Sequence, residues 1–302
     1  MLEEFKLISK KNNALFNIND NVVLLTFDVN YVDQSVNLME SIIKHNKDVS
    51  FICLCTQLNE TCMRVLMERR YGICVYEYSV NLNNSNINII EGRWPVVMLF
   101  RLFSPWLIDE NIAEVLYLDS DMVCKGDIHE LLDMKKEEYL LALCNEIRGN
   151  IVQMDFFSKN FEKDIYCNSG TLKININRMV ERYNPQEILN VFKEKADYFI
   201  FPDQDLLNYY FHDKIRYLNN FLYNFQAYEL RKSNIYKAAV NKAKIIHFSI
   251  GKPWDYKANF DLIKLYLSLS SYEPMIRRCK KAYIKRLLML PILVVQKVIS
   301  KF

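Results

Sequence analysis

Apolar, strand-like runs alternate with helical segments along the first 80 residues, and this alternation constrains the fold more than any other feature of the sequence. The apolar runs cover residues 21–27, 49–56 and 73–78, and segments with helical spacing lie between them at 33–45 and 58–70. Strands that alternate with helices form βαβ units around a parallel sheet. The sequence therefore predicts an α/β fold.

Elements of the same two kinds continue to about residue 270. We expect further strands at 115–118, 139–144, 167–176 and 244–249, and further helices at 95–107, 178–196, from 202 and at 258–270. Asp33 is a plausible N-cap of the first helix. The segments 81–92 and 145–166 show little pattern, and loops as long as the second are commonly functional or mobile. Because no repeat or low-complexity linker is present, we predict one domain over residues 1–271 and a C-terminal appendage over 272–302.

The charges are distributed unevenly. The net charge is +3, but residues 275–302 hold eight Lys/Arg and no acid, so the remaining body carries 31 basic and 36 acidic residues, about −5. A nucleic-acid-binding domain would carry a broad basic face. Because the body of this chain is acidic, we do not expect it to bind nucleic acid. The 19 Tyr and 18 Phe are expected mostly in the core, with a base or sugar stacked on an aromatic face as the alternative.

The cysteines and the N-terminus favour the cytoplasm. The eight cysteines have neither C-x-x-C nor paired zinc spacing, and several lie in apolar runs, where a free cysteine acts as a small hydrophobe. Early acids and no apolar h-region in the first residues predict no signal peptide.

Two carboxylates follow directly after one apolar strand. The run from Val115 to Leu118 leads into Asp119 and Asp121. In extended chain, residues two apart point to the same side, and ligands of open α/β sheets bind at the carboxyl ends of the strands. Two hard oxygen donors suit Mg²⁺ or Mn²⁺ shared with substrate phosphates. The alternative is a pair of turn or surface acids.

Six short motifs between residues 22 and 256 resemble, in the same order, those of the family 8 glycosyltransferases, which are retaining enzymes of GT-A fold that use nucleotide sugars. The motifs here are Asp28-Val29-Asn30-Tyr31, Phe100-Arg101-Leu102, Asp119-Ser120-Asp121, Asn168-Ser169-Gly170, Asp203-Gln204-Asp205-Leu206-Leu207-Asn208, and His247 with Gly251-Lys252-Pro253-Trp254. Two departures stand out. Leu99 occupies a position where the family often has Tyr, and the stretch from His247 to Lys252 is one residue shorter.

The resemblance implies a GT-A, Rossmann-like fold with a mixed, mainly parallel sheet between helices. It also implies that Asp119, Asp121 and His247 hold Mn²⁺ or Mg²⁺. The alternative for His247 is a structural role, because a histidine that follows an apolar strand is commonly part of the packing. Lys252 would offer a point charge to the diphosphate, and Gly251 would allow close approach of the backbone.

The remaining motif residues would contact the nucleotide and the sugar. Those assigned to the nucleotide diphosphate are Thr26, Asp28, Asn30, Tyr31, Arg101 and Ser120, and those assigned to the sugar are Asn168, Asp203 and Gln204. A turn with a helix cap is the alternative for Asp28 and Asn30, snorkelling to solvent for Arg101, and an N-cap for Asp203. Because a carboxamide such as Gln204 is a poor nucleophile, retention in the family is often explained by front-face attack, and no separate carboxylate nucleophile is identifiable.

The C-terminal appendage over residues 272–302, called the tail below, is basic and apolar. Its longest apolar run, residues 287–295, is broken by Pro291 and is too short to span a bilayer, which takes about 20 residues. This composition favours a peripheral anchor on anionic lipid, with a helix packed on the domain as the alternative.

The resemblance thus predicts a cytoplasmic hexosyltransferase on the inner face of the plasma membrane. It would move galactose or glucose from its UDP form to a bacterial surface glycan or glycolipid of the lipopolysaccharide or capsule type. The alternatives are transfer to a protein-bound glycan and a catalytically silent membrane adaptor. The sequence predicts no oligomeric state.

Overall fold

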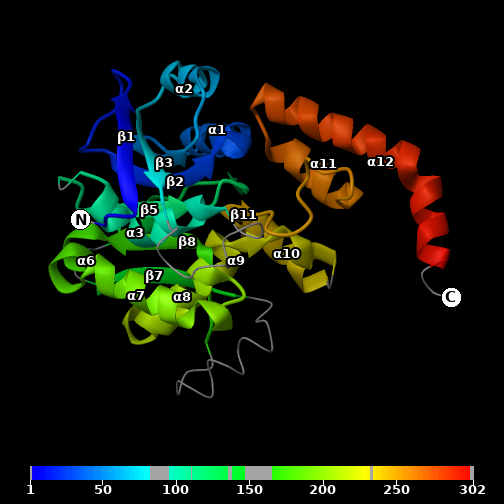
Figure 1. Cartoon of the computed structure of the whole chain (residues 1–302). Coiled ribbons are helices and arrows are strands. Elements are labelled where there is room, and N and C mark those ends of the chain that lie inside the picture. The colour runs from blue at the N-terminus through cyan, green and yellow to red at the C-terminus, as the bar shows by residue number, and fades with distance from the viewer. Residues whose placement is uncertain are drawn as a thin grey trace.

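A computed structural model describes residues 2–81, 95–109, 111–134, 138–146, 165–231 and 234–299. Its centre is an eight-stranded sheet with strand order β1-β4-β3-β2-β5-β8-β7-β9 (Figure 1). The pairs β2/β3, β3/β4, β2/β5 and β7/β9 are parallel, and the other three are antiparallel. The strands are β1 (Phe5–Asn12), β2 (Asn21–Asp28), β3 (Val49–Thr56), β4 (Ile73–Val80), β5 (Glu114–Leu118), β7 (Leu141–Asn145), β8 (Cys167–Asn175) and β9 (Ile215–Leu218).

A second, three-stranded sheet lies beside the first. Its order is β10-β11-β6, with β6 at Met122–Cys124, β10 at Phe225–Gln226 and β11 at Ile245–His247. The α-helices are α1 (Val32–Ile43), α2 (Glu60–Met67), α3 (Phe100–Leu107), α4 (His129–Leu132), α6 (Ile176–Arg182), α7 (Pro185–Lys195), α8 (Pro202–Phe211), α9 (Asn220–Tyr223), α10 (Asn234–Lys242), α11 (Phe260–Leu269) and α12 (Glu273–Ile299). The short 3-10 helices η1 (Val29–Tyr31) and η2 (Val96–Leu99) precede α1 and α3.

The large sheet separates two hydrophobic cores. Alternate side chains of β2 divide between them: Val23 and Leu25 pack with α1 and α11, whereas Leu24 packs with α3, α6, α7 and α8. Side chains of a strand point alternately to opposite faces, so a strand buried on both faces is continuously apolar. This confirms the predicted α/β fold with a mixed, mainly parallel sheet between helices.

Several local predictions were wrong. The expected helix over 178–196 is two helices, because Pro185 disfavours helical backbone at the preceding residue, and Asn184 instead caps α7 through the backbone N–H of Gln186. Asp33 is not an N-cap. The chain enters α1 directly from η1, with Tyr31 at the cap position and Asp33 in the first turn. Strand β1 was not predicted, and of the small sheet only β11 was expected, within the strand at 244–249. Residues 82–92 and 147–164 of the two irregular segments lie outside the described residues.

The pairing of three strands brings distant motifs to one place. Strand β8 runs antiparallel to β5 with Leu118 opposite Thr171, so the start of β8 lies where β5 ends, and the Asp119 N–H donates to Gly170 O at 2.9 Å. Strand β11 pairs with β6 so that His247 lies opposite Met122. The candidate site therefore forms where the two sheets meet.

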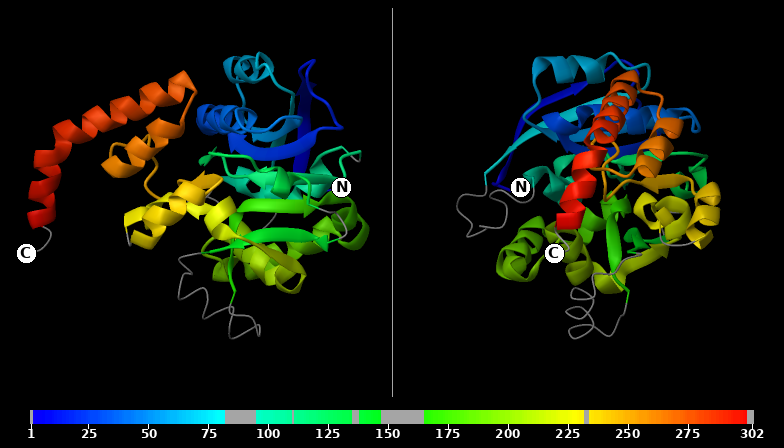
Figure 2. Two further views of the ribbon diagram at one scale, coloured as in Figure 1. Left: turned by 180° about the vertical axis from the view of Figure 1, so that it is seen from behind. Right: turned by 90° about the vertical axis from the view of Figure 1, so that its right-hand side faces the viewer.

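Helix α12 packs on the domain over its first turns. Met275, Cys279 and Ala282 are buried, in contact with the α1 and α11 side of the molecule. Its later turns extend away from the sheets in Figure 1 and in the left view of Figure 2. Within the described residues, no helix combines the length and apolar character that crossing a membrane requires.

Candidate active site

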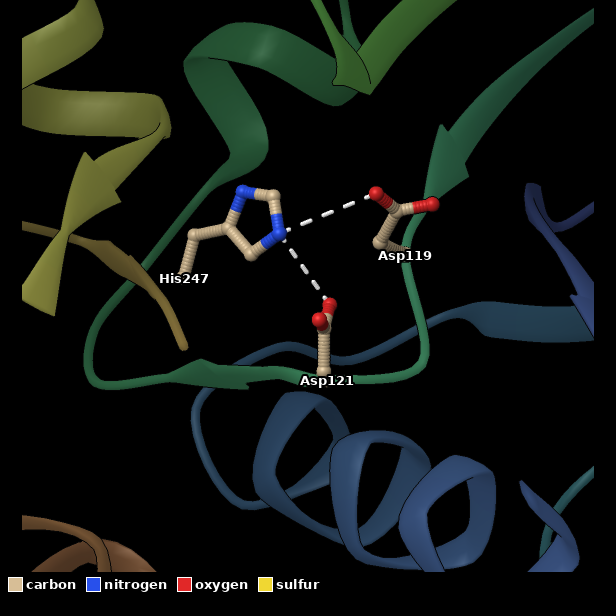
Figure 3. A group of neighbouring side chains, drawn as sticks. All are labelled: Asp119, Asp121 and His247. Carbon is tan, nitrogen blue, oxygen red and sulfur yellow. Dashed lines mark ion pairs between the residues drawn. The ribbon is translucent and has the colours of Figure 1, made fainter. Parts of the chain in front are cut away.

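Asp119, Asp121 and His247 converge at the junction of the two sheets (Figure 3). His247 Nε2 lies 3.1 Å from Asp121 Oδ1 and 3.7 Å from Asp119 Oδ2, and one potential ligand atom from each residue lies within 4.8 Å of the others. The chain from Asp119 to Asp121 is a turn, closed by the Met122 N–H and Asp119 O at 3.1 Å, and not the predicted extended backbone. The carboxylates converge on His247 because the chain leaves the large sheet after β5, and β6 then pairs with β11 in the small sheet.

A chain of hydrogen bonds fixes which nitrogen of His247 carries hydrogen. The Gly170 N–H can only donate, and it donates to Asn168 Oδ1 at 2.9 Å, while Asn168 Nδ2 faces Glu146 Oε2 at 2.7 Å. Asn224 Nδ2 donates to the same Asn168 oxygen at 2.7 Å, which leaves Asn224 Oδ1 as an acceptor 2.8 Å from His247 Nδ1. Because Nδ1 must donate, a neutral imidazole presents the lone pair of Nε2 to the two carboxylates.

This arrangement fits a divalent cation. Three acceptor groups face one point, and Asp121 Oδ1 is buried without a hydrogen-bond donor. Buried acceptors without a donor are costly, and a cation between them removes the cost. Carboxylate oxygens suit Mg²⁺ and Mn²⁺, and a metal-binding histidine commonly donates its other nitrogen to an amide or carboxylate.

Lys252 adds a positive charge to the same point and forms an ion pair with Asp121. Burial alone would raise the pKa of Asp121, but the charge of Lys252 outweighs burial and the pKa lies well below its usual range. Burial opposes the charge of Lys252, yet Asp121 raises the pKa of the lysine above its usual value. Burial also raises the pKa of the nearby Tyr31 hydroxyl, so this group remains a hydrogen-bond donor at neutral pH.

Arg101 joins two parts of the site. Its guanidinium lies 2.9 Å from Asp119 Oδ1 and 3.2 Å from Asp203 Oδ2, donates to Ser169 Oγ at 3.0 Å, and lies over the Tyr117 ring. Burial opposes its charge, but Asp119 raises the pKa of Arg101 above its usual value. The side chain is buried, so the alternative of snorkelling to solvent was wrong.

Two adjoining cavities share Asp119, Asp121, Gln204 and Lys252. The first, of about 340 Å³, is also lined by Thr26, Asp28, Tyr31, Arg101, Ser120 and Asp203. The second, of about 370 Å³, is also lined by Glu146, Tyr166, Asn168 and His247. Cavities of a few hundred Å³ with a small number of convergent polar groups are typical ligand sites.

Two predicted residues lie outside these linings. Asn30 is exposed, and its backbone N–H donates to Asp28 Oδ1 at 2.9 Å, so Asp28 also caps η1. Gly251 has φ of +71°, and an added Cβ would lie 3.2 Å from Leu262 Cδ1. This left-handed backbone favours glycine and turns the chain between His247 and Lys252.

The side chains predicted to contact the sugar are joined to one another. Gln204 Oε1 accepts from Asn168 Nδ2 and from the Ser169 N–H, both at 3.0 Å, and Asp203 Oδ2 accepts from Ser169 Oγ at 3.1 Å. The alternative role of Asp203 as an N-cap is wrong. No side chain caps α8, and Asp205 Oδ2 instead accepts from the N–H groups of Ile200 and Phe201.

Sequence reasoning missed several residues of the site. Glu146 directly follows β7, as Asp28 closes β2, so an acid at a strand end was a usable signal. Tyr117 donates to Asp119 Oδ1 at 2.5 Å, but the sequence around it indicates only an apolar strand residue. Asn224 lies between α9 and β10, in a stretch with no pattern that singles it out.

Comparisons with known proteins agree with this geometry. The family model described as glycosyl transferase family 8 matches residues 22–258. A lipopolysaccharide 1,2-glucosyltransferase of Escherichia coli is 24% identical over 253 residues, which are 79% of this chain and 74% of that protein. A lipopolysaccharide 1,3-galactosyltransferase of Salmonella typhimurium is 25% identical over 69% of this chain and 64% of that protein.

Solved structures show the same fold. The galactosyltransferase LgtC, in complex with donor and acceptor sugar analogs, superposes with a TM-score of 0.64 at 21% identity, over 85% of this chain and 98% of LgtC. The bifunctional glycosyltransferase WbbM gives a TM-score of 0.65 at 23% identity, over 88% of this chain and 52% of that one. With the fold, the motifs and the family model in agreement, the chain belongs to glycosyl transferase family 8 and is a glycosyltransferase of GT-A fold.

Proposed function

We propose that this glycosyltransferase is a metal-dependent, retaining hexosyltransferase that moves galactose or glucose from its UDP form to a hydroxyl of a bacterial surface glycan. One observation carries the proposal: Asp119, Asp121 and His247 converge, with the charge of Lys252 beside them, at the boundary of two polar cavities. The diphosphate of a nucleotide sugar needs positive charge between a nucleotide pocket and a sugar pocket, and a bound cation together with Lys252 would supply it.

The proposed division of labour follows the two cavities. Asp119, Asp121 and His247 hold Mn²⁺ or Mg²⁺, which when bound offsets the negative charge of the diphosphate leaving group. Lys252 contacts the diphosphate, and the turn at Gly251 positions this lysine. In the first cavity, Thr26, Asp28 and Tyr31 bind the nucleoside together with Ser120 and Arg101, and Asn30 acts through Asp28.

The second cavity takes the hexose. Asn168 of this cavity and Asp203, which lines the first cavity beside the shared Gln204, hydrogen-bond sugar hydroxyls. Gln204 lies at the anomeric carbon on the face opposite the leaving group. The side chain of Gln204 is held by Asn168 and Ser169, so its orientation precedes substrate binding. In front-face transfer the leaving phosphate accepts the proton of the acceptor hydroxyl, and the protein side chains orient both sugars and exclude water.

The acceptor class rests on the named relatives, which include enzymes of lipopolysaccharide synthesis. We place the enzyme in the cytoplasm, on the inner face of the plasma membrane, with residues 272–302 on anionic lipid. Two alternatives are transfer to a protein-bound glycan and a silent membrane adaptor. The second has no physical need for three convergent metal ligands.

Calorimetric titration with UDP, with and without Mn²⁺, tests the proposal. We expect tight binding only with the metal, and an equimolar complex. Binding of the same strength with the metal removed would contradict the metal assignment, and no binding under either condition would make the silent adaptor the better hypothesis. Screening UDP-glucose and UDP-galactose for hydrolysis then identifies the donor.

A further inference from the structure

A basic groove lies next to the candidate active site. It has a volume of about 470 Å³ and is formed by the loop that follows β11 and by α12. Its lining includes four basic residues, Lys252, Arg278, Lys281 and Lys285, and one acid, Asp255. Lys252 also lines both cavities of the donor site, so a single side chain borders the groove and the proposed diphosphate position.

The two walls of the groove are fixed to each other. Arg286 Nη1 donates to the carbonyl oxygens of Tyr256 and Lys257 at 3.3 and 2.8 Å, and the rings of Phe260 and Tyr283 pack edge to face with centroids 4.9 Å apart. These contacts hold α12 against the loop before any ligand binds. A preformed concave site loses little conformational entropy when a ligand enters it.

The charges of the groove are available to an anion. Arg278, Lys281 and Lys285 are exposed, and no carboxylate lies within ion-pair distance of them among the described residues. Lys285 lies over the Tyr256 ring at 4.3 Å. The Asp255 carboxylate accepts from the Lys257 N–H at 2.9 Å. Clustered Lys and Arg with free donors are a typical phosphate site.

The neighbouring surface identifies a lipid as the source of that phosphate. Three large apolar residues of α12 lie within one to three turns after Arg278 and are exposed. They are Ile284, Leu287 and Leu288, which are 57%, 46% and 74% exposed. Large apolar side chains beside clustered positive charge on one helix are typical of helices that lie in a membrane interface. A soluble phosphate would leave these three side chains in water.

We propose that this groove binds the phosphate head group of an anionic phospholipid. The inference rests on the proposed membrane association of the tail but not on the transferase activity. In this proposal, one discrete site, and not only the overall positive charge of the tail, holds the protein on an anionic membrane. Because Lys252 lines both sites, a lipid held there places the donor cavity at the membrane surface, where a glycolipid acceptor is presented.

Co-sedimentation of the full chain with vesicles tests the groove. The vesicles contain either phosphatidylcholine alone or phosphatidylcholine with phosphatidylglycerol. The groove variant is R278Q/K281Q, and the matched control is R277Q/K280Q, which removes the same two charges from exposed positions of the same helix outside the groove. Circular dichroism and the melting temperature verify that both variants fold.

We expect binding only to the anionic vesicles, a loss of about 30-fold in the groove variant, and less than about threefold in the control, because each membrane-facing charge contributes about 1 kcal/mol. Equal losses in both variants would show that diffuse charge binds the membrane, and would overturn the proposal. It would also fail if inorganic phosphate bound the groove in calorimetry while vesicle binding was insensitive to R278Q/K281Q. None of these readouts depends on transfer activity, so they separate the groove from the proposed enzymatic function.

Discussion

At the scale of single residues, the orientation of His247 depends on two buried amides. Asn224 and Asn168 are 1% and 7% exposed, and the oxygen and nitrogen of Asn168 are assigned by partners that can only donate or only accept. The Gly170 N–H identifies the oxygen of Asn168 and the Glu146 carboxylate identifies its nitrogen, and the orientation of Asn224 follows from that of Asn168. In a neutral imidazole, the lone pair of His247 Nε2 is thereby aimed at Asp119 and Asp121 before any cation binds, which lowers the cost of assembling the proposed metal site.

Replacement of Asn224 tests this orientation. Asn224→Leu removes the acceptor for His247 Nδ1, so we expect Mn²⁺ to bind about 10- to 100-fold more weakly and the free energy of unfolding to fall by about 1–3 kcal/mol. Asn224→Asp keeps an acceptor for Nδ1 and should retain more of the affinity. Calorimetric titration with Mn²⁺ in the presence of UDP measures both. Affinity in Asn224→Leu equal to that of the natural protein would show that the tautomer is fixed by other means.

Asp121 is the most constrained of the three proposed ligands, because it also pairs with Lys252. Asp121→Asn removes the negative charge and should leave the circular dichroism spectrum unchanged. We expect metal-dependent transfer to fall by about a thousandfold or more, since loss of the cation removes several kcal/mol of charge stabilisation. Initial rates over a range of Mn²⁺ concentrations provide the measurement. Unchanged turnover in this variant would rule out the metal assignment.

At the scale of elements, the site depends on how closely β8 approaches β6 and β11. Gly170 is the point of contact: an added Cβ would lie 2.7 Å from His247 Cε1 and 2.8 Å from Met122 Cε. Glycine therefore lets the β8 backbone lie against the histidine. A larger residue would push apart the strands that bring His247 to the carboxylates.

The Gly170→Ala variant should therefore lose stability and metal affinity together. We expect about 1–3 kcal/mol lower free energy of unfolding, as for other overpacked interiors, and weaker Mn²⁺ binding. Gly126→Ala is the matched control, because its added Cβ would meet only Lys244 Cγ at 4.0 Å, and a change within about 0.5 kcal/mol is expected there. Urea unfolding measures both variants. Equal stability of the two alanine variants would show that the Gly170 contact relaxes without cost.

The elements that the sequence predicted well are those buried on both faces. Strand β3 is buried at every position, so its continuous apolar run was a clear signal. Strand β1 was missed because only Phe5 of its eight residues is buried, as befits the edge of the sheet. Strands β6 and β10 of the small sheet have three and two residues, too few for any periodicity to show, whereas β11 lies within the strand expected at 244–249.

The residues of the site were predictable where a motif named them, and not where only the fold brings them in. Asp119, Asp121 and His247 converge as the motifs implied, but through a turn and a second sheet that local sequence does not encode. Asn224 is 23 residues from the histidine it orients, and the contact exists only because β10 pairs with β11. Short-range patterns carry no information on such a pairing.

At the scale of the whole molecule, the site joins parts of the protein that pack in separate cores. Phe27, Met122 and Phe248 belong to the core that contains α1 and α11, whereas Cys167 and Leu206 belong to the core with α3 and α8. Chain segments that bear site residues come from both cores and meet at the proposed metal and sugar positions. A ligand bound there contacts both halves, so its binding energy adds to the stability of the whole domain and not to one element.

We therefore expect UDP and Mn²⁺ together to raise the melting temperature of the entire domain in a single transition. A ligand at about 100 times its Kd stabilises the native state by about 2.7 kcal/mol, which corresponds to a rise of several degrees for a chain of this size. Because Mn²⁺ and the diphosphate share one charge centre, each ligand alone should give a smaller rise than the pair, and by linkage each should strengthen the other by the same factor. Differential scanning calorimetry with UDP, Mn²⁺ and both measures these shifts, with Asp121→Asn as the control that should lose the joint effect. A rise with UDP that persists unchanged in EDTA would separate nucleotide binding from the metal and contradict the shared centre.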